Sequence, residues 1–301
     1  LNAVWGSSDT NVLAVGGGGV IQRWNGANFT PTLLVTADDL AAVWGSSGSD
    51  VFSVGAFGTR MHWDGAAWDV ENTGFDLFGL WGASGTDVYH VGFGGAIRHY
   101  NGASWTAEGI GVTTEPLVGV WGVPGAEVFA VGLNGTILRK GGGTWEPLAS
   151  LTTQNLLGVW GSSVTNLYAV GANGTIRHYD GVAWSGRPSG TSNQLNGVWG
   201  SSPTDVFAVG AGGTIVHYDG TGISWSPMTS PTVQSLWGVW GTSGSNVYAV
   251  GNTGTILHYD GVAWTRMTSG TTRILSGVWG ATGTDIFVVG AGGTILRYRP
   301  I

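Results

Sequence analysis

The stretch GVWGSSPTDVFAVGAGGTIVHYDG, at residues 197–220, decides the fold because it returns eight times along the chain with small changes. The tryptophan of its Val-Trp-Gly (Leu-Trp-Gly once) marks the copies, at Trp5, Trp44, Trp81, Trp121, Trp160, Trp199, Trp240 and Trp279. Successive tryptophans are 39, 37, 40, 39, 39, 41 and 39 residues apart. A fixed period of this length indicates stacked or radially arranged structural units.

Each unit is expected to form four strands and no helix. In the unit at 195–235, short apolar segments rich in Val, Ile and aromatic residues alternate with Ser/Thr/Asp- or Gly-rich turn sequences. The Ala-Gly-Gly between the second and third segments suits a tight hairpin turn. The expected strands, in chain order, are A (195–200), B (205–210), C (214–218) and D (224–228).

Strand B is apolar on both faces, with Val206 and Ala208 on one and Phe207 and Val209 on the other. A sheet with one solvated face would alternate polar and apolar residues, so this sheet must be covered on both sides. Radial repetition covers every sheet with its neighbours and gives a β-propeller. Linear stacking would need polar caps, and neither terminal unit resembles one.

The strand count predicts an all-β, eight-bladed β-propeller of four-stranded antiparallel blades in a single domain, 1–301. Strands A, B and C occur eight times, but strand D occurs seven times, led by Phe29, Trp68, Trp105, Trp145, Trp184, Trp225 and Trp264. The last blade therefore has three strands unless residues upstream of Leu1 complete it. Seven blades is the alternative, which would leave three strand segments unused. The repeats span approximately 1–39, 40–76, 77–116, 117–155, 156–194, 195–235, 236–274 and 275–301.

Composition limits the possible partners. The chain has 56 glycines, one lysine and a net charge of −7, which argues against nucleic acid because phosphate neutralisation needs clustered Lys and Arg. There is no cysteine for a disulfide or a thiolate metal site. No signal peptide and no apolar run of membrane-spanning length is visible.

The pattern VGxxGTIxHYDGxxW, seen at residues 250–264, resembles the BNR/Asp-box class of propellers. It is also similar to photosystem II assembly-factor propellers and to repetitive bacterial propellers with WGSSxxDVxAVG units, of the kind found in surface proteins. The resemblance covers the whole chain. It implies a propeller fold and leaves the activity open, and the tryptophan-rich repeat is shared with some sugar-binding propellers.

Two repeated polar positions carry candidate chemistry. One position in strand C is His62, His99, His178, His217 and His258 in five units and Arg in the others, and Arg cannot replace a metal ligand. The position before strand B alternates between Asp or Glu and Asn, which predicts an Asx turn rather than a calcium site. We therefore expect structural roles, with no metal and no cofactor.

Binding residues are expected where the repeats differ. The B–C turn and D–A loop sequences share one face, and units two to four place Phe57, Phe93 and Leu133 in turns where other units have Gly, Ala or Asn. Phe75 and Phe78 lie nearby in sequence, and Asp69, Glu71, Asp76, Glu108 and Glu115 are expected to form an acidic rim. Trp237 follows the leading Leu of its strand A, a candidate channel-mouth position. An apolar centre with a charged rim is typical of a recognition site.

The sequence thus predicts a non-catalytic binding or scaffold propeller that recognises a protein partner through its variable loop face, at a cell surface or in a secreted assembly. A carbohydrate-binding propeller is the alternative, so the expected partner is a protein or a glycan. A hydrolase or lyase comes third, since we find no nucleophile–base pair and no Gly-x-Ser-x-Gly motif. The oligomeric state is left open.

Overall fold

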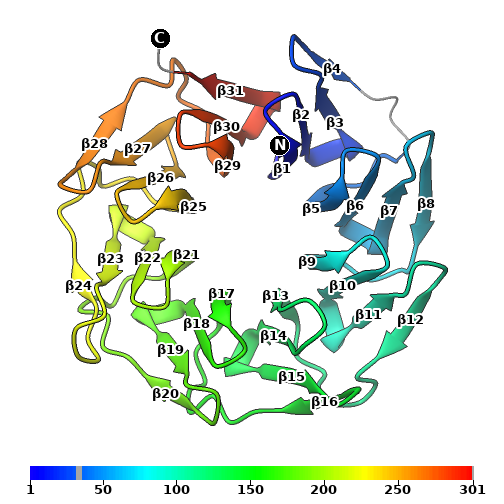
Figure 1. Cartoon of the computed structure of the whole chain (residues 1–301), viewed down its shortest axis with the longest axis horizontal. Coiled ribbons are helices and arrows are strands. Elements are labelled where there is room, and N and C mark those ends of the chain that lie inside the picture. The colour runs from blue at the N-terminus through cyan, green and yellow to red at the C-terminus, as the bar shows by residue number, and fades with distance from the viewer. Residues whose placement is uncertain (32–35, 300–301) are drawn as a thin grey trace. The chain divides into compact units, whose positions relative to one another are not determined.

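The strands of each repeat pair antiparallel and in chain order, as their short connections require (Figure 1). A computed structural model describes residues 1–31 and 36–299. In these residues it holds eight sheets, seven of four strands and a last one of three, and the chain is an all-β, eight-bladed β-propeller. We call each sheet a blade, numbered by its repeat. The predicted fold class is confirmed.

The blades form two compact units, Leu1–Ala130 with Leu138–Pro147, and Val131–Ile137 with Leu148–Ile301. The strands of blades 1 to 4 are β1 (Ala3–Ser8), β2 (Asn11–Val15), β3 (Ile21–Trp24), β4 (Phe29–Pro31), β5 (Leu40–Ser47), β6 (Asp50–Gly55), β7 (Thr59–Trp63), β8 (Trp68–Asn72), β9 (Leu77–Ser84), β10 (Asp87–Gly92), β11 (Ile97–Tyr100), β12 (Trp105–Glu108), β13 (Leu117–Gly122), β14 (Val128–Gly132), β15 (Ile137–Gly141) and β16 (Thr144–Pro147).

The remaining blades belong to the second unit. Their strands are β17 (Leu156–Ser163), β18 (Asn166–Gly171), β19 (Ile176–Tyr179), β20 (Trp184–Gly186), β21 (Leu195–Ser202), β22 (Asp205–Gly210), β23 (Ile215–Tyr218), β24 (Ser226–Pro227), β25 (Leu236–Ser243), β26 (Asn246–Gly251), β27 (Thr255–Tyr259), β28 (Trp264–Met267), β29 (Leu275–Thr282), β30 (Asp285–Gly290) and β31 (Thr294–Tyr298).

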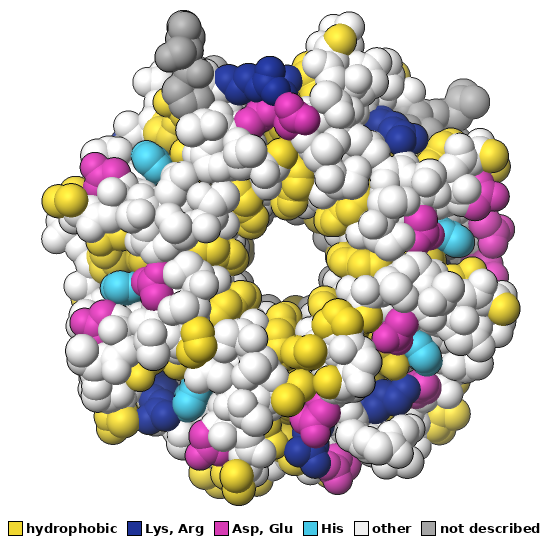
Figure 2. All heavy atoms as spheres, in the orientation of Figure 1, with side chains coloured by type: hydrophobic (Ala, Val, Ile, Leu, Met, Phe, Trp, Pro, Cys, Tyr) yellow, Lys and Arg dark blue, Asp and Glu magenta, His cyan; other side chains and the backbone are white. Residues whose placement is uncertain are grey.

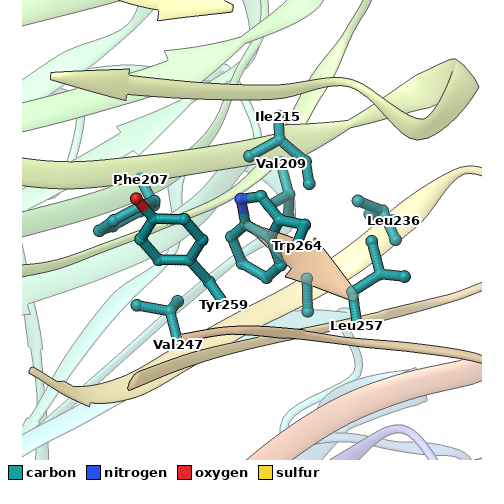
Figure 3. Close-up of a cluster of buried hydrophobic side chains, with 9 residues drawn as sticks. Phe207, Val209, Ile215, Leu236, Val247, Leu257, Tyr259 and Trp264 are labelled. Atoms are coloured by element: carbon teal, nitrogen blue, oxygen red, sulfur yellow. The ribbon is translucent and has the colours of Figure 1, made fainter. Parts of the chain in front are cut away.

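Strand B of a blade is buried on both faces, as its composition predicts. In β22, Val206 and Ala208 pack into a cluster with blade 5, while Phe207 and Val209 pack into a cluster with blade 7. Figure 3 shows Trp264, from β28 of blade 7, together with Phe207 of blade 6. All four β22 side chains are completely buried, so hydrophobic contact between neighbouring blades is the main source of stability.

The Val-Trp-Gly motif is a contact between successive blades. A Cβ added to Gly82 would lie 2.5 Å from Cζ3 of the indole of Trp44 in the preceding blade, which is too close for any side chain. The same arrangement places Trp5 on Gly45, Trp81 on Gly122, Trp160 on Gly200, Trp199 on Gly241 and Trp240 on Gly280. These tryptophans are half-buried. The tryptophan of one repeat therefore explains the glycine of the following one.

The two repeated polar positions bond to each other. The Nε2 of His217 lies 2.6 Å from Oδ1 of Asp205, and the ring stacks on Phe207 with centroids 4.2 Å apart. His62 with Asp50, His99 with Asp87, and His258 with Asn246 repeat this bond. Figure 2 shows histidines at several places on the face it draws, most of them beside an acidic side chain. The expected Asx turn is wrong, since these side chains reach strand C.

The Trp–Gly contact predicts unequal effects of adding one methyl group. Gly200→Ala places its Cβ against the indole of Trp160, and we expect a loss of about 1–3 kcal/mol in the free energy of unfolding from this overpacking. Gly158→Ala is the control, because its Cβ would make only ordinary contacts, the nearest at 3.5 Å. Urea unfolding measures both variants. Equal stability of the two variants would contradict the contact's role.

Candidate functional site

The B–C turn has a demanding backbone conformation that is shared by all blades. Its second residue is in the left-handed region, with φ between 52° and 65°. Such a φ suits Gly and is tolerated by Asn, whereas bulky side chains are strained there. The residues at this position are Gly18, Phe57, Gly94, Asn134, Asn173, Gly212, Thr253 and Gly292.

Phe57 is the bulky residue in this left-handed position, with φ of 53°. The sequence analysis aligned it with Phe93 and Leu133, and this alignment is wrong. The turn of blade 2 is Ala56–Gly58 and the turn of blade 3 is Phe93–Gly95, so Ala56 matches Phe93 and Phe57 lies one residue later. The side chain of Phe57 is 66% exposed. The side chain is therefore too exposed for its packing to offset the backbone strain.

Asp76 joins the turns of blades 2 and 3. Its Oδ1 accepts a hydrogen bond from the amide of Phe57 at 2.8 Å, and its carbonyl oxygen accepts one from the amide of Phe93, also at 2.8 Å. The amide of Gly74 donates to the carbonyl of Phe57 at 3.1 Å, which brings the loop carrying Phe75 against the same turn. Phe57, Phe75 and Phe93, which we call the turn patch, thus lie on connected backbone.

A cavity of about 410 Å³ opens beside the turn patch. It is lined by Phe75 and by residues 93–98, 107–111 and 113, and we call it the blade-3 groove. Phe75 is 60% and Phe93 55% exposed, and Ile110 is even more exposed at its edge. The structure thus brings two of the predicted residues to one apolar cavity. A cavity of this size can accept a side chain of a binding partner.

The other predicted site residues lie outside this groove. Phe78 is half-buried in β9. Leu133, half-buried, and Trp237, 41% exposed, belong to the second compact unit. The indole nitrogen of Trp237 donates to Oδ1 of Asn252 at 2.7 Å, which ties strand β25 to the B–C turn of its own blade.

The expected acidic rim does not form around the groove. Asp69 and Glu71 line a separate cavity with Arg60, and Arg60 forms an ion pair with Glu71. Glu108 does line the groove, but Nζ of Lys140 donates to its two oxygens at 2.7 Å each, and the indole of Trp145 donates to it at 2.9 Å. Internal pairing therefore occupies the carboxylates of Glu71 and Glu108.

Sequence reasoning missed two residues of the groove, Arg98 and Ile110. Arg98 lies in the strand C segment of its unit, and Ile110 lies in a variable loop, so neither departs visibly from the repeat. The signal that could have found them is a comparison of each arginine with the residue opposite it on strand D. Cross-strand neighbours form the natural partners of a charged residue in a sheet.

His90 is a buried titratable group near the groove. Its position in strand B is Ala in five other blades, but here the ring is 1% exposed and lies against Trp105, with centroids 4.8 Å apart. Neither ring nitrogen has a hydrogen-bond partner in the described residues. Burial, followed by the charges of Arg60 and Arg98, lowers the pKa of His90 to about 3. The ring is therefore neutral at ordinary pH.

Neither a metal site nor a membrane-spanning helix is found in the described residues, 1–31 and 36–299. Within them, no three side chains of His, Cys, Asp or Glu come together in a way that could hold a metal ion. No helix in this part of the chain has the length and apolar character needed to cross a membrane.

Comparisons with known proteins identify the fold. No family model matches the sequence, and no curated protein matches it. "YCF48 bound to D1 peptide" is similar with a TM-score of 0.68 and 17% identity, over 88% of this chain and 92% of that one. The C-terminal WD40 domain of Sif2 has a TM-score of 0.78 and 12% identity, covering 99% and 95%. YCF48 from Cyanidioschyzon merolae has a TM-score of 0.61 and 16% identity, over 100% of this chain and 95% of that one. At these identities the likeness shows a repetitive β-propeller.

The strain at Phe57 predicts that its removal stabilises the fold. We expect Phe57→Asn, which introduces the residue of blades 4 and 5, to raise the free energy of unfolding by about 1 kcal/mol, because Asn tolerates the left-handed region. Urea unfolding measures this change. Phe93→Ala, outside the left-handed region, is the control and should be nearly neutral. A clear loss of stability in Phe57→Asn would show that the side chain packs.

Burial of His90 predicts a pH-dependent stability. The unfolded chain protonates this histidine near its ordinary pKa of about 6.5, while the folded pKa is about 3, so stability is full above 6.5 and falls as the pH drops towards 3. Between pH 7 and pH 5 the wild type should lose roughly 2 kcal/mol more than His90→Ala. Urea unfolding at both pH values gives this difference. Equal losses would contradict a neutral, buried His90.

Proposed function

We propose that this chain is a non-catalytic recognition propeller that binds an extended segment of a protein partner at the turn patch and the blade-3 groove. The exposed, strained Phe57 carries this proposal. Residues in sparsely populated backbone regions cluster at binding sites, where the strain serves function. Neither the fold nor the turn needs this phenylalanine, since seven blades form the same turn with another residue.

The surroundings of Phe57 favour a macromolecular partner. Three phenylalanines that are each more than half exposed lie within one stretch of connected turns, beside an apolar groove. Aromatic anchors of this kind dominate the binding energy of protein interfaces. A segment in extended conformation could lay one side chain into the groove while its neighbours cover Phe57 and Phe75. The similarity to a propeller solved as "YCF48 bound to D1 peptide" is compatible with this mode.

A glycan partner has less support. Most of the repeated tryptophans are held between blades, and Trp237 is the one described tryptophan with a large exposed area. Glycan recognition would therefore depend on this single side chain in the second unit. We also propose, from the repeat pattern, that the chain is related to BNR/Asp-box propellers. The same proposal includes a location at a cell surface or in a secreted assembly.

Selection from a displayed random-peptide library tests the proposed function. The wild type should retain peptides that bind at the turn patch. The double variant Phe57→Asn, Phe93→Ala should bind them roughly 30-fold more weakly, because truncating such anchors costs about 2 kcal/mol or more. Both replacements are residues that other blades carry at these turn positions, so the fold is retained.

Val262→Ala is the matched control, since it removes an exposed apolar side chain from a C–D turn, at the opposite end of its blade. This variant should bind the selected peptides as the wild type does. Failure to recover any binding peptide, or equal binding by the double variant, would overturn the proposal. A glycan array on the same proteins reports on the carbohydrate alternative.

A further inference from the structure

Blade 2 shows how this fold satisfies an arginine on strand C. Arg60 of β7 lies directly opposite Glu71 of β8, and the two side chains form an ion pair. The guanidinium is buried, whereas the side chain of Glu71 is half exposed. A partly exposed carboxylate, that of Glu71, therefore neutralises the buried guanidinium of Arg60. Charge-assisted bonds between guanidinium and carboxylate are among the strong polar contacts in proteins.

Blade 3 keeps the arginine and lacks the carboxylate. Arg98 of β11 lies opposite Ala107 of β12, the position that Glu71 has in blade 2. Arg98 is half-buried, and its guanidinium has no hydrogen-bond or ion-pair partner among the residues the structure describes. Ala107 is exposed, and both residues line the blade-3 groove. The place that Glu71 fills in blade 2 is thus part of an open cavity in blade 3.

The acidic side chain that lines the groove, Glu108, is already bound by other groups. Glu108 is bound by Lys140 and by the indole of Trp145, and its Oε1 lies 3.3 Å from Nδ1 of His99. The interaction between Arg98 and Arg60 is repulsive: burial, followed by the positive charge of Arg98, lowers the pKa of Arg60 to about 10. Arg98 is therefore an uncompensated positive charge, which favours an anion in the groove.

We infer that the blade-3 groove reads an acidic residue of the partner segment: an Asp or Glu side chain whose carboxylate binds Arg98 in the place that Glu71 fills in blade 2. The apolar wall made by Phe75, Phe93 and Ile110 takes a bulky apolar side chain next to this acidic residue. This inference rests on the proposed function, because it names the chemistry of the segment that the same groove binds.

Blade 5 carries the matched comparison within the chain. Arg177 of β19 lies opposite Gly186 of β20, so this arginine also lacks a cross-strand carboxylate. A cavity of about 560 Å³ lies over these two residues, but the residues lining it include no aromatic side chain. Blade 5 thus offers a similar arginine without the apolar wall. Among the residues that the structure describes, blade 3 alone has both elements of the recognition site that we infer.

A small aromatic acid tests the inference without knowledge of the partner. The probe is 3-phenylpropionate, which joins a carboxylate to an apolar ring, and 3-phenylpropionamide is its uncharged match. Two-dimensional NMR titration measures both dissociation constants. The acid should bind the wild type at least tenfold more tightly than the amide, and this preference should disappear in Arg98→Gln.

Ala107→Glu gives a second test that does not remove the arginine. The substitution gives Arg98 the cross-strand carboxylate that Arg60 has in blade 2, and the fold should be retained because position 107 is exposed. The new carboxylate should compete with the acid and raise its dissociation constant at least tenfold. Arg177→Gln is the control and should bind the acid as the wild type does. Equal binding of acid and amide, unchanged binding in Ala107→Glu, or no binding of the acid up to its solubility limit would overturn the inference.

The library selection separates this inference from the proposed function. Selected peptides should be enriched in Asp or Glu next to a bulky apolar residue, and Arg98→Gln should weaken them at least tenfold. Peptides that need Phe57 and Phe93 but show no acidic enrichment and bind Arg98→Gln normally would overturn the inference and leave the proposed function intact. Failure of the selection itself would overturn the proposed function.

Discussion

Burial of strand B on both faces is the constraint on which the rest of this structure depends. A sheet whose middle strand carries Val206 and Ala208 on one side and Phe207 and Val209 on the other is stable only between two neighbours. In six of the repeats, the tryptophan of the Val-Trp-Gly motif contacts the glycine of the next blade and limits how closely the two blades approach. His217 is bound to Asp205, and its ring stacks on Phe207 of strand B, which packs in the same interface.

Side chains in the turns are more exposed than those of strand B, and the blades differ most at these turns. The B–C turn is held by backbone hydrogen bonds, in which Asp76, Asp39 and Asn155 connect the turns of successive blades. The backbone geometry is thereby fixed while the side chains stay free to vary. Phe57 is accepted there because the surrounding hydrogen bonds hold its left-handed conformation. A rigid frame with variable exposed side chains is what recognition by a β-propeller requires.

The fold could be predicted from the sequence because its signals are repeated eight times. The doubly apolar strand B and the Gly-rich hairpin each appear in every unit, so local ambiguity in one copy is resolved by the others. The candidate site could be predicted only in part. Phe75 and Phe93 stood out as departures from the repeat, but Phe57 was placed one residue out of register because a turn sequence does not show which residue is left-handed. The pairing of His217 with Asp205, and the internal pairing of Glu108, depend on contacts between strands that spacing alone does not reveal.

The residue opposite the strand-C arginine has a consequence for protein engineering. It is Glu71 in blade 2, Ala107 in blade 3 and Gly186 in blade 5, and it lies on the outermost strand, where no interior packing depends on it. A single exchange there would add or remove the carboxylate partner of the arginine, with the hydrophobic interior untouched. One chain can therefore be diversified blade by blade, with each arginine set independently, to give a family of binders that differ in specificity and share one scaffold.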